Sequence, residues 1–142
     1  MELSLLENFD PLTCISGKMS RLTRRTAGIF RKHLKPYGIT SSQLSLLFIL
    51  SKQTKGLTQT QISDIAILEK SSLNRNLQRL FEMKYLSRSE FPLITITSKG
   101  KVFVNEIIPA WENAMSEIRR LLGNDGEEAL NKVYSKLINK KT

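Results

Sequence analysis

Residues 57–97 contain the pattern that most restricts how this chain can fold. Two short segments, separated by a few residues, each have apolar residues three and four positions apart, as amphipathic helices do. Two helices so close in sequence bring their apolar faces together in one small core, which here would be made by Ile62, Ala66, Leu68, Leu73, Leu77 and Leu80. Residues 87–90 and 93–97 then read as two short strands of a hairpin. The pattern predicts a winged helix-turn-helix with a short β-hairpin wing.

The second of these helices would keep one polar face in solvent. The residues on that face are Ser71, Ser72, Asn74, Arg75, Gln78 and Arg79. Their side chains include donors for phosphate oxygens and base edges, and a single α-helix fits the major groove of B-DNA. The sequence therefore indicates DNA binding.

Arg75 and Asn74 are the first candidates for base contacts, because arginine pairs with guanine O6 and N7 and asparagine with adenine N6 and N7. Ser71 and Ser72 stand where the helix begins, so their hydroxyls and the free amides suit a phosphate, a role compatible with capping the helix. Gln78 and Arg79, one turn further on, would reach bases or the DNA backbone, and Lys70 and Arg88 would contact phosphates rather than bases. Four residues at the starts of other helices would contact the DNA backbone: Thr58, Gln59, Ser41 and Gln43.

The net charge of +9 is distributed unevenly along the chain. No acidic residue lies between Asp10 and Asp64, and nine cations fall there: Lys18, Arg21, Arg24, Arg25, Arg31, Lys32, Lys35, Lys52 and Lys55. A basic face of this kind attracts polyanions through counterion release, although a merely solvated surface is the alternative. Beside a helix-turn-helix pattern, nucleic acid is the favoured partner.

The segments that flank this unit have helical periodicity as well. We predict a mainly α fold and a single domain over residues 1–142, with a core at about 40–97 and helices at about 11–37 and 98–140. Within the core, helices are expected at about 43–53, after a cap at Thr40, Ser41 or Ser42, and from Lys70 or Ser71 to Lys84. Pro36 and Gly38 should end the first helix, and Pro109 should kink or break the last near Ile108. Residues 123–126 read as a turn before a final helix at 127–140.

The apolar faces of these terminal helices lie outside the compact unit. They are expected either to cover their own domain or, as we favour, to form a homodimer whose two-fold symmetry matches a palindromic site. No apolar run approaches the ~20 residues of a membrane span, and the N-terminus lacks the basic region of a secretion signal, so a cytoplasmic protein without membrane contact is expected.

The residues argue against an enzyme and against a resident cofactor or metal. One cysteine, Cys14, allows no internal disulfide, and one histidine, His33, allows no paired-histidine metal site. The sequence has neither a constellation of paired carboxylates with a base nor a glycine-rich phosphate loop. The alternative to a DNA-binding regulator is a winged-helix protein-interaction module without specific DNA binding.

The order of segments at residues 39–50, 57–89 and 93–100 resembles the multiple-antibiotic-resistance regulator (MarR) family of winged-helix transcription factors over nearly the whole chain. This resemblance implies a homodimer with interdigitating terminal helices on a palindromic operator. It also implies regulation by a small aromatic or phenolic ligand between the dimer and DNA-binding lobes. Aromatic residues that could line that pocket, although interface core is favoured for them, are Trp111, Phe103 and Tyr134.

The chain departs from the family pattern at two places, and Cys14 invites comparison with one branch of the family. The family's wing has a longer tip with an arginine for the minor groove, whereas here Glu90 to Leu93 close the loop. Ile67 stands where the family often has a turn glycine. Cys14 lies near the place of the reactive cysteine of a peroxide-sensing branch, followed by Lys18, but the next tyrosine is Tyr37. A structural thiol is therefore favoured over a redox sensor at Cys14.

Overall fold

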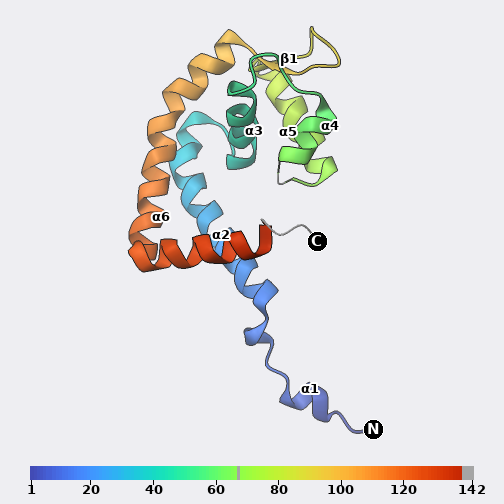
Figure 1. Ribbon diagram of the computed structural model, residues 1–142, viewed down its shortest axis with the longest axis vertical. Coiled ribbons are helices and arrows are strands. Elements are labelled where there is room, and N and C mark those ends of the chain that lie inside the picture. The colour runs from blue at the N-terminus through green and yellow to red at the C-terminus, as the bar shows by residue number, and fades with distance from the viewer. Residues whose placement is uncertain (67, 139–142) are drawn as a thin grey trace.

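The computed structural model describes residues 1–66 and 68–138. Ile67 at the turn and the predicted end of the last helix at Lys140 lie outside the described residues. The elements in chain order, shown in Figure 1, are α1 (Ser4–Asn8), the 3-10 turn η1 (Pro11–Thr13), α2 (Ile15–Leu34), the 3-10 turn η2 (Lys35–Tyr37), α3 (Ser41–Ser51), α4 (Gln59–Ile65), α5 (Lys70–Glu82), β1 (Leu86–Ser87), β2 (Thr95–Ile96) and α6 (Ser98–Ile138). The expected mainly α winged helix-turn-helix is confirmed. Within the described residues, no helix is both long enough and apolar enough to cross a bilayer.

Helix α3 is the centre of the core and packs against α2, α5 and α6. Four of its leucines are buried, which explains the nearly continuous apolar run: Leu44, Leu46, Leu47 and Leu50. Thr40 is the residue that caps it: its hydroxyl accepts from the Gln43 amide, and the Gln43 side chain accepts from the Thr40 amide in return. This reciprocal capping satisfies amides that the first turn of a helix leaves unpaired.

The helix-turn-helix core forms as the sequence predicts. Ile62 of α4 is fully buried together with three leucines of α5, and Ala66 and Leu68 from the connection pack against them. Helix α5 ends at Glu82, two residues before the predicted Lys84. The reason is that Lys84 has φ of 67°, a left-handed conformation that cannot continue a helix.

The wing is a minimal antiparallel hairpin in which Leu86 pairs with Ile96 and Ser87 with Thr95. Leu57, which precedes α4, adds a bridge to Ile94 and so ties the wing to the helix-turn-helix. This contact depends on Gly56, whose φ is +87°. A side chain there would place its Cβ 2.7 Å from the Ile94 carbonyl oxygen.

The expected break of the last helix at Pro109 does not occur. Helix α6 runs from Ser98 to Ile138, and Gly123 is the residue with non-helical dihedrals, so the helix does not break at Pro109. Pro109 is exposed, and so is Asn105, whose carbonyl loses its helical partner. Water can hydrate that carbonyl, which makes the proline tolerable. The predicted turn at 123–126 is confined to Gly123: the helix resumes directly, and its last segment runs across the molecule (Figure 1).

An ionic cluster joins the end of α2 to α6. The Lys32 ammonium lies 2.7 Å from a carboxylate oxygen of Glu117, and His33 Nε2 lies 3.1 Å from the same oxygen. The hydrogen bond that Lys32 donates to the Glu117 carboxylate holds the pKa of Glu117 below its ordinary value of 4.5, and the hydrogen bond between His33 and the same carboxylate lowers that pKa further.

This cluster predicts an acid-dependent contribution to stability. Because the folded pKa is lowered, the contribution of Glu117 is present above pH 4.5 and is lost as the pH falls through the folded pKa. We expect Glu117→Gln to lower the melting temperature near pH 7 and to differ less from the wild type as the pH falls below 4.5. The control is Glu112→Gln, an exposed carboxylate on α6 that makes no ion pair among the described residues. Equal losses for both variants would contradict the role of the cluster.

Candidate nucleic-acid interface

Helix α5 divides into a buried face and a polar face. Leu73, Leu77 and Leu80 are at most 2% exposed. Among the residues predicted for the opposite face, Ser72 is half-buried and the others are exposed: Ser71, Asn74, Arg75, Gln78 and Arg79. The division follows the helical period, since positions three and four apart lie on one side. A continuous polar strip of donors is therefore available on one rigid element.

The start of α5 differs from the sequence expectation in one respect. The N-cap residue is Glu69, and no side chain caps the helix by a hydrogen bond, so Ser71 and Ser72 do not serve as caps. Instead, the Ser72 hydroxyl accepts a hydrogen bond from the Arg75 guanidinium at 3.3 Å. Lys70 is exposed in the first turn, where amide groups point outward and suit an anion.

A side-chain contact links α4 to the polar face of α5. The Gln59 amide donates a hydrogen bond to the Asn74 side-chain oxygen. The sequence predicted for Gln59 only a contact with the DNA backbone. It carries no signal for a hydrogen bond between Gln59 and Asn74, which are fifteen positions apart. The contact restrains the Asn74 side chain, which is a candidate base reader, from the neighbouring helix.

Arg88 of the wing lies against α5. Its guanidinium is 4.1 Å from the centre of the Phe81 ring and donates to the Gln78 side-chain oxygen at 3.2 Å. The cation on an aromatic face and the hydrogen bond together hold the wing beside the polar face of α5. The structure thus brings Arg88 and Gln78 together, a contact that neither the periodicity nor the composition of the sequence could predict.

Three of the remaining predicted residues belong to helix starts. Thr58 caps α4, and its hydroxyl accepts from the Gln61 amide at 3.2 Å. Gln43 is part of the reciprocal cap of α3. Ser41 begins α3 and, with Thr40 and Ser42, lines an open pocket of about 560 Å³ whose other wall includes Arg31 and Lys35 of α2. That pocket has two cations and several hydroxyls, a setting suited to an anionic group.

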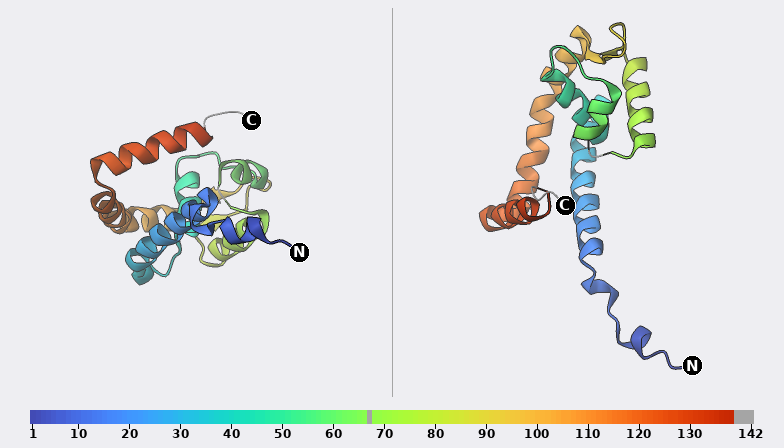
Figure 2. Two further views of the ribbon diagram at one scale, coloured as in Figure 1. Left: turned by 90° about the horizontal axis from the view of Figure 1, so that it is seen from below. Right: turned by 45° about the vertical axis from the view of Figure 1, so that its right-hand side comes forward.

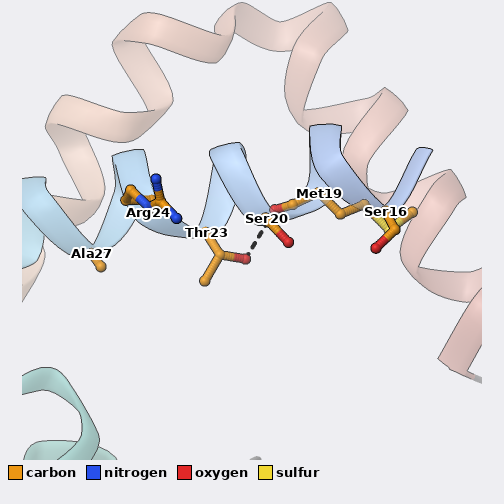
Figure 3. Close-up of a pocket in the computed structure, with 6 residues that line it drawn as sticks. All are labelled: Ser16, Met19, Ser20, Thr23, Arg24 and Ala27. Carbon is orange, nitrogen blue, oxygen red and sulfur yellow. Dashed lines mark hydrogen bonds between the residues drawn. The ribbon is translucent and has the colours of Figure 1, made fainter. Parts of the chain in front are cut away.

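The basic helix α2 carries a second groove, shown in Figure 3. Its lining comes from α2 alone: Ser16, Met19, Ser20, Thr23, Arg24 and Ala27. The Thr23 hydroxyl donates to the Met19 carbonyl at 3.1 Å, so it is satisfied within the helix. Because a single helix supplies the whole lining, this groove is an open strip of helix surface.

The three aromatic candidates for an effector pocket lie in different surroundings. The ring of Trp111 meets the ring of Phe48 edge to face, with 5.5 Å between the ring centres. The ring of Phe103 stacks on that of Tyr85, with 4.4 Å between the ring centres. Trp111 and Phe103 both pack against the core. Tyr134 is 53% exposed on the last segment of α6. Burial raises the pKa of the Tyr85 hydroxyl, and Glu106 adds to this rise. Core packing therefore explains Trp111 and Phe103 without a ligand.

Cys14 is the cap of α2. It is exposed, and its sulfur accepts a hydrogen bond from the Gly17 amide at 3.4 Å. The contact gives the thiol a structural role at the start of the helix; that Cys14 is not a redox sensor stays a prediction.

The sequence matches no family model, and no curated protein matches it. Solved structures, however, match nearly the whole chain. BpsR of Bordetella bronchiseptica has 19% identity over 93% of this chain and 98% of its own, with a TM-score of 0.85. The reduced form of MarR from E. coli has 17% identity over 95% and 98%, with a TM-score of 0.73.

A MarR-family protein of Mycobacterium tuberculosis in complex with DNA has 17% identity over 89% of this chain and 98% of its own, with a TM-score of 0.69. These similarities extend through the terminal helices as well as the helix-turn-helix. The chain therefore has the fold of the MarR-family transcriptional regulators.

Proposed function

We propose that this chain is a sequence-specific DNA-binding transcriptional regulator that acts as a homodimer on a palindromic operator. The observation that carries the proposal is the polar face of α5, with Arg75 and Asn74 near its start and the wing fixed beside it. The solved structure of a protein with the same fold in complex with DNA supports it. In this proposal the recognition helix α5 enters the major groove, Gln78 and Arg79 reach bases or phosphates, and the residues at the other helix starts contact the DNA backbone.

Selection from a random DNA pool tests this function directly. A regulator should enrich one palindromic sequence and should bind it more tightly than random DNA at the same salt concentration. Enrichment of no sequence, with weak and wholly salt-dependent binding, would contradict the proposal.

The proposed dimer rests on apolar side chains that a single chain leaves in solvent. On the N-terminal side they include Leu5, Leu6, Phe9 and Ile15, and every residue from 1 to 13 is exposed. This segment extends away from the rest of the molecule in Figure 1 and in the right-hand view of Figure 2. On the C-terminal side the exposed residues are Leu121, Leu130, Val133, Tyr134, Leu137 and Ile138. A second copy of the chain would cover both sets.

We expect sedimentation at micromolar concentration to report twice the monomer mass of 16.2 kDa. Replacing Leu130 and Leu137 together by aspartate should shift the protein toward monomers, because two charges would be buried in the apolar contact. Lys132→Ala, an exposed polar position on the same segment, is the control and should stay dimeric. A monomeric wild type would remove the argument for a palindrome.

An effector is the further part of the proposal. The pocket of about 560 Å³ between α2 and α3, with Arg31 and Lys35, would accept a small aromatic acid or phenol. DNA binding by BpsR is regulated by 6-hydroxynicotinic acid, which supports a ligand of this size for the fold. We expect such compounds to release the protein from operator DNA and the Arg31→Ala variant to lose this response.

The alternative function is a winged-helix protein-interaction module. The observation that favours it is the short wing tip, where Glu90 adds a negative charge and the Arg88 guanidinium contacts α5. A salt-dependent mobility-shift assay with genomic DNA fragments distinguishes the two functions, because a module without DNA specificity would not select any fragment.

A further inference from the structure

The tip of the wing holds one aromatic side chain in solvent. Phe91 is 82% exposed, more than any other aromatic residue in the described part of the chain. Its position is fixed by two successive turns: the Phe91 amide donates to the Arg88 carbonyl at 3.1 Å, and the Leu93 amide donates to the Glu90 carbonyl at 3.0 Å. Ile94, which follows Leu93, is buried and anchors the loop to the core. The ring is thus presented by an ordered loop, so that little entropy is lost when it binds.

The loop is also fixed relative to the proposed DNA-binding face. Arg88, at the base of the tip, contacts both Gln78 and Phe81 of α5. A duplex that fills the polar face of α5 would therefore pass the wing. With Arg88 engaged on α5, the large apolar side chain that the wing exposes most is the Phe91 ring.

We infer that Phe91 is an apolar wedge that enters the minor groove beside the recognition helix and partly unstacks one base step. The inference rests on the proposed DNA-binding function. Minor-groove proteins use phenylalanine and other apolar side chains in this way and bend the duplex as they do so. Pyrimidine–purine steps such as TA and CA unstack most easily, so the wing would select such a step without a hydrogen bond to a base.

The charge at the tip agrees with recognition by shape. Glu90 precedes Phe91 and is exposed, so its carboxylate is repelled by phosphates. The tip would therefore add no attraction that depends on salt. It would add sequence preference and bending, while Glu90 itself weakens binding to every duplex.

The test uses the full chain and the operator selected from a random pool, with fluorophores at both ends to report bending and 2-aminopurine at the pyrimidine–purine step to report unstacking. We expect Phe91→Ala to bind this operator about tenfold more weakly, to bend it less and to lose the 2-aminopurine signal. Its dependence on salt should equal that of the wild type, since no charge is removed. Phe91→Leu should retain most of the wild-type behaviour, and Glu90→Gln should bind all duplexes more tightly.

A second comparison assigns the effect to the step itself. Replacing the pyrimidine–purine step by a stiff A-tract should weaken the wild type and leave Phe91→Ala unchanged. Wild-type affinity and bending in a folded Phe91→Ala variant would overturn the wedge and leave the proposed function intact; the exposed ring would then be free for a protein contact. Failure of the wild type to select any sequence would overturn the proposed function, and the wedge with it.

Discussion

Leu80→Ala is expected to lower the free energy of unfolding by about 2–5 kcal/mol. Leu80 is 0% exposed and lies in the cluster shared by α3, α4, α5 and the wing. Removing three of its carbons loses their transfer free energy and leaves a cavity that the surrounding helices cannot fill completely. Urea denaturation at a fixed protein concentration measures the loss, since a dimer's stability depends on concentration.

The control for this variant is Ser71→Ala on the exposed face of the same helix. It should change stability by no more than about 0.5 kcal/mol, as surface substitutions usually do. A loss below about 1 kcal/mol for Leu80→Ala would mean that α5 is not packed on the core as described, and the polar face assigned to it would be wrong as well.

Arg75→Ala is expected to cost about 1–3 kcal/mol of binding free energy on the preferred operator and much less on random DNA. The side chain is exposed on the polar face and is held near the start of α5 by the Ser72 hydroxyl. A bidentate contact to guanine is lost only where a guanine is read, so the loss should reduce discrimination. Titrations of both duplexes at one salt concentration give the comparison.

Arg24→Ala and Arg25→Ala are the matched controls, because both cations are exposed on α2. If they touch DNA, they should weaken all sequences alike and flatten the dependence on salt. Equal losses for Arg75→Ala on operator and on random DNA would show that α5 does not read bases.

Much of the fold could be predicted because its signals are local. The apolar period places Ile62, Leu73 and Leu77 on inner faces, and the structure buries all three. Thr40 and Thr58 cap helices where the sequence offers caps, because a hydroxyl three residues before a free amide is a short-range geometry. The polar face of α5 follows from the same period, so the candidate DNA-contacting residues could be named in advance.

The tertiary structure decided the features that depend on exposure to water or on contacts between residues far apart in the sequence. Pro109 is compatible with an unbroken helix because it and Asn105 face water, which a local rule for proline does not consider. The Gln59–Asn74 and Arg88–Gln78 contacts pair residues fifteen and ten positions apart, and no periodicity encodes them. The sequence alone determined which helices form and which faces are polar; the packing of wing on helix determined which polar groups are restrained and which side chain, Phe91, is left to project.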